Sequence, residues 1–216
     1  MSKTFSTIED FILVTSQISE DGSVNINFTT GELNVPIENQ FPFLIEAKDL
    51  KLDEALAKMP TALRFELIML EYEFLLDDLK WDELDGANDS GGKSGRMNSQ
   101  LIIKYPNLAD KADWSKIKSV YLANILKFQP QFCDRVDFSK INPIGISDLL
   151  QIRPEFESNF DLNILNLPEN FSNWFSLIKK QPQFAKYCDW SQFNEYGKKQ
   201  LLEFNPSLSV YMTDLK

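Results

Sequence analysis

Five prolines recur at nearly constant spacing through the second half of the chain and restrict what this half can fold into. They are Pro106, Pro130, Pro154, Pro182 and Pro206, separated by 24, 24, 28 and 24 residues. A proline cannot continue the helix before it, because it lacks the N–H that the helix requires, but it fits the first turn of the next helix. Each proline therefore predicts the end of one helix and the start of another.

The residues around these prolines align in the same register. Two adjacent aliphatic residues precede each proline: Leu101–Ile102, Ile125–Leu126, Leu149–Leu150, Leu177–Ile178 and Leu201–Leu202. Two positions after it stands Leu108, Phe132, Phe156, Phe184 or Leu208. Seven positions after the first four prolines come Asp113, Asp137, Asp161 and Asp189, which are followed by Trp114, Phe138, Leu162 and Trp190. In the fifth copy Thr213 takes the aspartate position, and the Asp–Leu pair follows one residue late.

This register predicts a pair of short helices in each repeat. The aspartate is a good N-cap for the turn that holds the Trp or Phe, and the recurrent aromatic residues are expected in the core. We expect Cys133 and Cys188 to be small buried hydrophobic residues. One repeat is too small to bury its own apolar side, so stacked neighbours are expected to form an α-solenoid-like array. The four extra residues of the longest spacing are expected in a loop at 166–173.

The segment QPQFAKYCDWSQF resembles tandem repeats of bacterial and phage proteins with the pattern W-x-x-LL-x-x-x-P-Q-F-A-x-x-C-D-W-S-x-L. The resemblance covers residues 97–216, with the third and fifth copies more divergent than the others. It implies a helical repeat architecture and a bacterial or phage source, and it carries no assigned activity.

The first half of the chain has a different pattern. Alternating apolar residues around a Thr–Gly pair at 23–37 predict a β-hairpin. Helical periodicity follows over about 52–84 and places Leu63, Leu67, Leu70, Phe74 and Leu75 on one side. We therefore expect an acidic N-terminal region at 1–85, a Gly-rich loop or linker at 86–96 and the helical repeats at 97–216. The predicted class is mainly α, with an α+β N-terminal part.

Composition narrows the function. The chain contains no histidine, which excludes the Ser–His–Asp and Cys–His catalytic systems and the usual zinc sites. Its 2 cysteines are too few for a disulfide framework, and no apolar run is long enough for a membrane span, so a cytoplasmic location is expected. Residues 1–96 carry 19 acidic against 8 basic side chains, whereas the remainder carries 13 against 14. This balance disfavours direct nucleic-acid or membrane binding and favours a protein partner with a basic surface.

A run of acidic residues supplies the candidate partner-binding site. It comprises Glu66, Glu71, Glu73, Asp77, Asp78, Asp82, Glu83 and Asp85. A solvated helix surface explains such a run, but a surface that attracts a basic protein or imitates nucleic-acid phosphates does so as well. Both interpretations stay open.

Two short motifs are weak matches. The segment at Gly92–Lys93–Ser94 resembles a phosphate-binding loop, but five residues separate it from Gly86 where the motif requires four. Asp82, Asp85 and Asp89 do not have the spacing of a calcium-binding loop. We therefore expect no cofactor, no metal and no catalytic residue. The main prediction is a non-enzymatic, protein-binding repeat scaffold. The alternatives are an inhibitor or immunity-type protein that blocks a basic enzyme site, and a nucleotide-binding protein or enzyme that uses Lys93.

Overall fold

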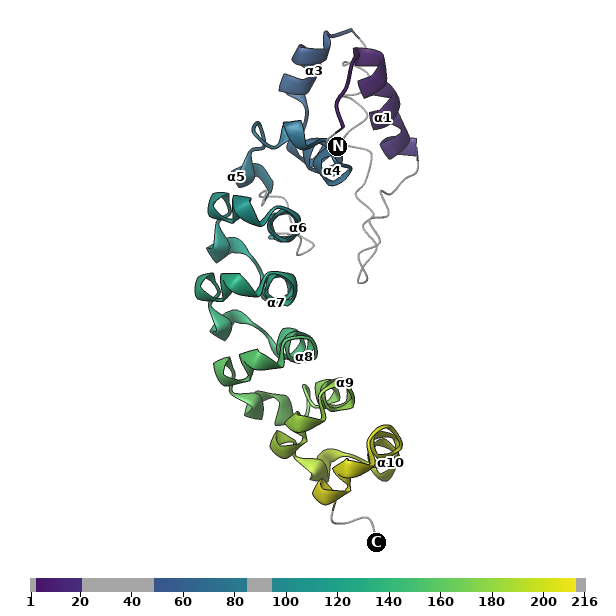
Figure 1. Cartoon of the computed structure of the whole chain (residues 1–216), viewed down its shortest axis with the longest axis vertical. Helices are drawn as coiled ribbons and strands as arrows, with labels where there is room; N and C mark the ends of the chain where they lie inside the picture. Colours follow the sequence, from purple (N-terminus) through teal and green to yellow (C-terminus); the bar gives the residue numbers. More distant parts are fainter. Residues whose placement is uncertain (1–2, 21–48, 85–94, 213–216) are drawn as a thin grey trace. The chain divides into compact units, whose positions relative to one another are not determined.

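The chain is mainly helical and divides into two compact units, Met1–Gly86 and Ala87–Lys216 (Figure 1). The computed structural model describes residues 3–20, 49–84 and 95–212, and it contains no strand within these ranges. The predicted mainly α class is confirmed. The expected hairpin at 23–37, most of the Gly-rich segment and the shifted Asp–Leu pair of the fifth repeat lie outside the described residues.

Unit 1 packs short helices around aromatic and aliphatic side chains. Its helices are α1 (Ile8–Glu20), α3 (Leu52–Lys58), α4 (Thr61–Met69), the 3₁₀ helix η2 (Glu73–Leu75) and α5 (Trp81–Leu84). Phe5 stacks on Tyr72 at 4.4 Å between ring centroids and meets Phe11 edge-on at 5.2 Å. Such arrangements are the favoured geometries for aromatic pairs. These rings therefore tie the start of the chain to the segment after α4.

The sequence predicts one continuous helical side from Leu63 to Leu75, and the second half of this prediction is wrong. Leu63 and Leu67 are buried on α4, but this helix ends at Met69 because Glu71 adopts a left-handed conformation with φ 78°. A non-glycine residue rarely takes this conformation, and it cannot continue a right-handed helix. Phe74 consequently lies on η2 with 39% of its surface exposed. The expected helical region at about 52–84 is thus a series of short helices.

Longer α-helices alternate with 3₁₀ helices in the described part of unit 2. The longer ones are α6 (Arg96–Lys104), α7 (Ser119–Phe128), α8 (Pro143–Leu150), α9 (Ser172–Lys180) and α10 (Glu195–Phe204). The 3₁₀ helices that begin at the repeat prolines are η3 (Pro106–Lys111), η5 (Pro130–Arg135), η7 (Pro154–Asn159), η9 (Pro182–Tyr187) and η11 (Pro206–Tyr211). The predicted helix pairs are confirmed, with a 3₁₀ helix as the second member.

The four repeat aspartates cap short 3₁₀ helices, as predicted. Asp113, Asp137, Asp161 and Asp189 each accept a hydrogen bond, 3.1 Å long, from the backbone N–H two residues later. The capped helices are η4 (Trp114–Lys116), η6 (Phe138–Lys140), η8 (Leu162–Asn166) and η10 (Trp190–Gln192). Each carboxylate thereby satisfies an N–H that the helix itself leaves without a partner.

The long helices of unit 2 pack on one another in chain order. Contacts join α6 to α7, α7 to α8, α8 to α9 and α9 to α10. Figure 1 shows these helices in one row, with the 3₁₀ helices along the other side. Nearly all members of the aliphatic pairs are buried, Leu202 and its half-exposed surface being the exception. The repeats therefore share one continuous hydrophobic core, which also contains Phe184 and Leu208.

The two end repeats differ from the middle ones at one core position. Eight residues before the proline, the middle repeats have Leu122, Ile146 and Trp174, whereas the first and fifth have Asn98 and Lys198. The first and fifth repeats thus bury a polar side chain where the middle repeats bury an apolar one.

The extra residues of the longest spacing lie where the sequence predicts them. In the second and third repeats the long helix begins six residues after the aspartate of the preceding repeat, but α9 begins eleven residues after Asp161. The added length lies partly in η8, which has 5 residues where η4, η6 and η10 have 3, and partly between the end of η8 and Ser172. The insertion is therefore confined to the side of the array that carries the 3₁₀ helices.

Replacing Phe184 with alanine should lower the free energy of unfolding by about 3–5 kcal/mol, because the ring is fully buried and its removal leaves a cavity. Urea-induced unfolding followed by circular dichroism measures the change. Phe128→Ala is the matched control, since 57% of Phe128 is exposed and its loss should change the stability by less than about 1 kcal/mol. Equal effects of the two substitutions would contradict the packing described above.

The capping aspartates should make stability depend on acidic pH. Hydrogen bonds from the hydroxyls of Ser115, Ser139 and Ser191 hold the pKa values of Asp113, Asp137 and Asp189 below their ordinary range. Because the folded-state pKa values are depressed, their stabilisation is present above about pH 4 and is lost as the pH falls through the folded-state values. A variant with Asp113→Asn, Asp137→Asn and Asp189→Asn keeps acceptors that do not titrate. Its unfolding free energy should fall less between about pH 5 and pH 2 than that of the wild type. Parallel pH profiles would refute this expectation.

Candidate functional site

The long helices of unit 2 expose one side to solvent in every repeat. The side chains ten, six, three and two positions before each proline are exposed or half-buried, and none of them is buried. These positions are four, seven and eight residues apart, so they lie on one side of an α-helix. We call this side of α6 to α10 the outer face.

Large apolar side chains recur at two positions of the outer face. Ten residues before the proline stand Val120, Ile144 and Tyr196, and two residues before it stand Phe128, Ile152 and Phe204, all of them exposed. Lys179 covers Phe204, with its Nζ 3.7 Å from the centre of the ring. Single exposed apolar residues are common on proteins, but here they recur at equivalent positions of the neighbouring helices α7 and α8. On α9 the two positions are Ser172 and Lys180, which separate this group from Tyr196 and Phe204 on α10.

Hydrogen bonds between repeats hold the C-terminal ends of the long helices in register. Gln129 Nε2 donates to the carbonyl of Ile103 at 2.7 Å, and Gln181 Nε2 donates to the carbonyl of Gln151 at 3.0 Å. At the equivalent position Arg153 Nε donates to the carbonyl of Lys127 at 3.0 Å. Each donor side chain stands immediately before a repeat proline and reaches the carbonyl three residues before the previous one. We call these three bonds the ladder.

The ladder is absent at the fifth repeat among the described residues. Asn205 occupies the donor position there, but its Oδ1 accepts from the backbone N–H of Ser207 at 3.1 Å. Two glutamines after the prolines strengthen the ladder elsewhere: Gln131 and Gln183 donate to Oε1 of Gln129 and of Gln181 at 2.8 and 2.9 Å. This explains the recurrent Gln–Pro–Gln sequence, whose role the sequence alone did not reveal.

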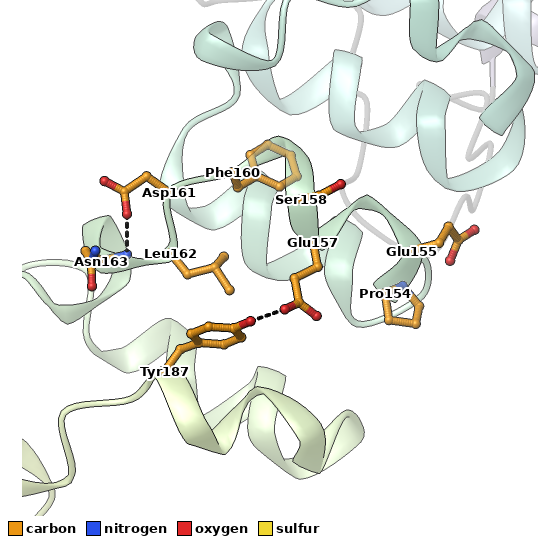
Figure 2. Close-up of a pocket in the computed structure, with 9 residues that line it drawn as sticks. All are labelled: Pro154, Glu155, Glu157, Ser158, Phe160, Asp161, Leu162, Asn163 and Tyr187. Atoms are coloured by element: carbon orange, nitrogen blue, oxygen red, sulfur yellow. Dashed lines mark hydrogen bonds between the residues drawn. The ribbon is translucent and has the colours of Figure 1, made fainter.

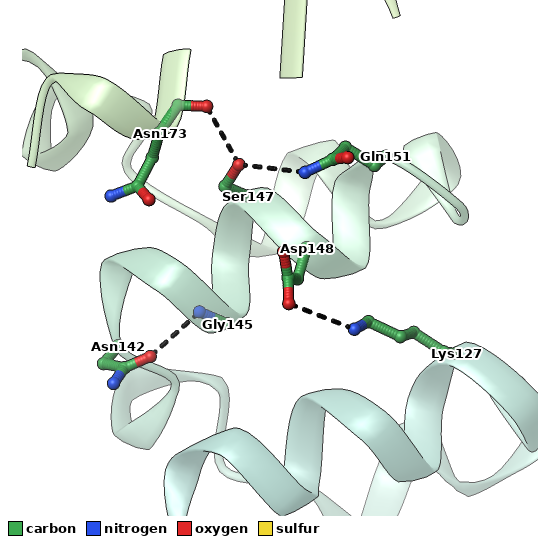
Figure 3. Close-up of polar contacts among 7 residues, drawn as sticks. All are labelled: Lys127, Asn142, Gly145, Ser147, Asp148, Gln151 and Asn173. Atoms are coloured by element: carbon green, nitrogen blue, oxygen red, sulfur yellow. Dashed lines mark hydrogen bonds and ion pairs between the residues drawn. The ribbon is translucent and has the colours of Figure 1, made fainter. Parts of the chain in front are cut away.

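Further polar contacts fix α8 between its two neighbours (Figure 3). Asp148 pairs with Lys127 of α7, the Oδ2–Nζ distance being 3.3 Å. On the other side the Ser147 hydroxyl donates to the carbonyl of Asn173 on α9 at 3.0 Å. Asn142 caps α8 by accepting from the N–H of Gly145 at 2.9 Å. Contacts with both neighbouring helices therefore fix the position of α8 in the middle of the outer face.

The opposite side of the array is occupied by structural contacts. The indole N–H groups of Trp114 and Trp190 donate to the carbonyls of Ala109 and Ala185 at 3.0 and 2.9 Å, and both rings pack against the core. Both rings are only partly buried, so they lie at the edge of the core in which the sequence predicts them. Cys188 is buried as predicted, and burial raises the pKa of its thiol above the usual range, whereas Cys133 is only half-buried.

A hollow of about 620 Å³ lies among η7, η8 and η9 (Figure 2). Leu162 lines it, at the position where the other repeats carry Trp114, Phe138 and Trp190, so a smaller side chain leaves space there. Glu157 in its wall accepts from the Tyr187 hydroxyl and lies 3.6 Å from Lys186 Nζ. Glu155 lies 3.8 Å from Arg153. The acidic groups of the hollow are therefore already matched by neighbouring donors.

The structure separates the predicted acidic site into different environments. Glu66 is only 6% exposed on α4, so its assignment to a binding surface is wrong. The exposed members are Glu71, Glu73, Asp77, Asp78, Asp82 and Glu83. Asp85 lies outside the described residues. We call the six exposed members the acidic surface.

Basic groups already contact part of the acidic surface. Asp78 is 3.4 Å from the guanidinium of Arg64, a side chain that is almost fully buried and also donates to the carbonyl of Leu56 at 2.5 Å. Lys80 lies 2.8 Å from Glu83 and lowers its pKa, together with a hydrogen bond from Thr61. The helical periodicity did not predict the burial of Arg64, because a polar residue in such a pattern is expected to face solvent.

The remaining candidate motifs have no described geometry. Lys93, on which the nucleotide-binding alternative depends, lies outside the described residues, and that alternative stays a prediction.

Across residues 3–20, 49–84 and 95–212 no three His, Cys, Asp or Glu side chains come together as a metal site. Over the same ranges no helix is both long and apolar enough to cross a membrane. No family model, curated protein or solved structure matches the chain.

Proposed function

We propose that this chain is a non-enzymatic protein-interaction protein whose repeats form an α-solenoid-like array and hold a partner protein on the outer face. The observation that carries the proposal is the recurrence of exposed apolar side chains in register: Val120, Ile144 and Tyr196 in one row and Phe128, Ile152 and Phe204 in another. Apolar surface exposed on neighbouring helices is costly in water and marks interaction sites. A stack of helices presents such rows at fixed spacing, which is the usual binding mode of helical repeats.

The lack of histidine supports a binding role rather than catalysis. The Cys188 thiol is buried, and its raised pKa keeps it protonated and therefore a poor nucleophile. The cytoplasmic location and the bacterial or phage source remain predictions from the sequence.

Substituting Phe128→Ser together with Ile152→Ser should abolish recovery of the partner when the tagged chain is used for affinity purification from a lysate of its native host. Both side chains are more than half exposed, so the fold should tolerate the change while the apolar contact is lost. Quantitative mass spectrometry measures the recovered proteins. Leu167→Ser is the matched control, because Leu167 is 45% exposed and precedes α9 outside the outer face. Unchanged recovery by the double variant would refute the proposal.

The acidic surface supports a second candidate function. Six carboxylates are exposed within Glu71 to Glu83, a segment that contains one basic residue, Lys80. Such a surface attracts basic proteins and can imitate nucleic-acid phosphates, so the chain would act as an inhibitor or immunity-type protein that blocks a basic enzyme site. This candidate function requires a protein partner with a basic surface, which the charge balance of residues 1–96 also favours.

Neutralising Glu73→Gln, Asp77→Asn and Asp82→Asn should release proteins of high isoelectric point from the bead-bound chain, because rim carboxylates steer and hold basic partners. Asp78 is left intact, since its carboxylate pairs with the buried Arg64. Capture is compared at about 0.1 M and 0.5 M salt, where screening should weaken the wild type as well. The control carries the same change of charge on unit 2: Asp134→Asn, Glu155→Gln and Glu169→Gln. Equal capture by the two variants would exclude the acidic surface as the binding site.

A further inference from the structure

One row of the outer face combines apolar and basic side chains in a fixed order. Two residues before the first four prolines stand Lys104, Phe128, Ile152 and Lys180, and all four are exposed. Phe128 and Ile152 are 57% and 52% exposed and occupy the middle, and a lysine stands at each end. We call these four residues the C-terminal row.

The ladder aligns the C-terminal row across four helices. Each ladder bond joins the residue just before one proline to the carbonyl three residues before the previous proline. Within one repeat, the row residue lies in the chain between the residue whose carbonyl accepts a ladder bond and the residue whose side chain donates the next one. Phe128, for example, stands between the Lys127 carbonyl and the Gln129 amide, each of which bonds to a neighbouring repeat. The four row side chains are therefore held side by side rather than staggered.

The insertion between the third and fourth repeats does not break this alignment. Gln181 reaches the Gln151 carbonyl at 3.0 Å across 30 residues, as Gln129 reaches the Ile103 carbonyl at 2.7 Å across 26. The added residues lie before α9, far along the chain from its C-terminal end. Lys180 therefore continues the row that begins at Lys104.

The charges of the outer face indicate whether its occupant is acidic or basic. Its basic residues are Arg96, Lys104, Lys127, Lys179 and Lys180, and its acidic residues are Asp148 and Glu203. Asp148 is already paired with Lys127. The net positive charge of this face thus contrasts with the acidic surface of unit 1. An acidic segment is complementary to it.

The spacing of the row indicates the conformation of an occupant. Packed helices lie about 8–10 Å apart, so successive row positions have roughly this separation. A segment in polyproline II conformation presents every third side chain on the same edge, about 9.3 Å apart. A β-strand places every third side chain on the opposite face and does not match the row.

We propose that the C-terminal row binds an extended, acidic protein segment in polyproline II conformation, with two apolar side chains three residues apart on Phe128 and Ile152 and a carboxylate three residues beyond each of them on Lys104 and Lys180. The proposal rests on the proposed function of the array and names the chemistry of the partner.

The test uses two fluorescein-labelled decapeptides and the full-length chain. The first peptide is Glu-Pro-Pro-Leu-Pro-Pro-Leu-Pro-Pro-Glu, and the second has lysine at both ends. Fluorescence anisotropy should show the acidic peptide binding about tenfold more tightly than the basic one at low salt, with the difference reduced by added salt. The double variant Lys104→Glu and Lys180→Glu should reverse this preference. Lys111→Glu with Lys140→Glu, on the 3₁₀ side of the array, should leave it unchanged.

Phe128→Ser with Ile152→Ser should weaken binding of the acidic peptide about tenfold or more, and circular dichroism should show the fold retained. Equal affinity for the two peptides, a preference that the lysine variant does not reverse, or no binding up to about 1 mM would overturn the proposal. Self-association of the chain that is lost in the Phe128→Ser, Ile152→Ser variant would also overturn it, by assigning the row to a second copy. If the peptide fails while that variant still loses its partner in affinity purification, this inference fails and the proposed function stands.

Discussion

The ends of α6, α7 and α8 are each completed by a side chain from the next repeat. Carbonyls in the last turn of a helix have no N–H partner within it, and the following proline cannot supply one. Gln129, Arg153 and Gln181 provide the missing donors from one repeat further along the chain. From α6 to α9, one kind of contact therefore combines helix termination with the stacking of the repeats and the alignment of the outer face. Burial of the aliphatic pairs stabilises the stack, and these donors determine the register in which neighbouring repeats pack.

The local elements of unit 2 could be predicted because their causes are local. The prolines end helices through a missing N–H, and Asp113 and its equivalents cap helices through a bond to a residue two positions away. In unit 1 the prediction failed where tertiary structure overrides periodicity. Glu71 turns the chain out of a helix that Leu63, Leu67 and Phe74 would otherwise continue, and Glu66 and Arg64 are buried. A polar side chain in a helical pattern does not reveal whether the rest of the molecule covers it.

The candidate site was missed for a related reason. Phe128 and Ile152 are apolar and stand close to aliphatic pairs that are fully buried, so hydrophobic periodicity does not mark them as exposed. Comparison among the repeats contains the missing signal. The pair positions are aliphatic in every copy, whereas the position two residues before the proline alternates between lysine and apolar residues: Lys104, Phe128, Ile152, Lys180 and Phe204. Lys104 and Lys180 are both exposed there, so this position is open to solvent, and the apolar residues found there need another explanation than the core.

The added residues between η8 and α9 show that the two sides of the array respond differently to a change in length. The 3₁₀ side absorbs them, and next to them the smaller Leu162 borders an open hollow, while the helix ends on the other side keep their bonding pattern. Small insertions and deletions on the 3₁₀ side therefore have little effect on the hydrogen bonds and alignment of the opposite side. During evolution the segments on the 3₁₀ side of such an array can change in length while the opposite side presents the same order of side chains.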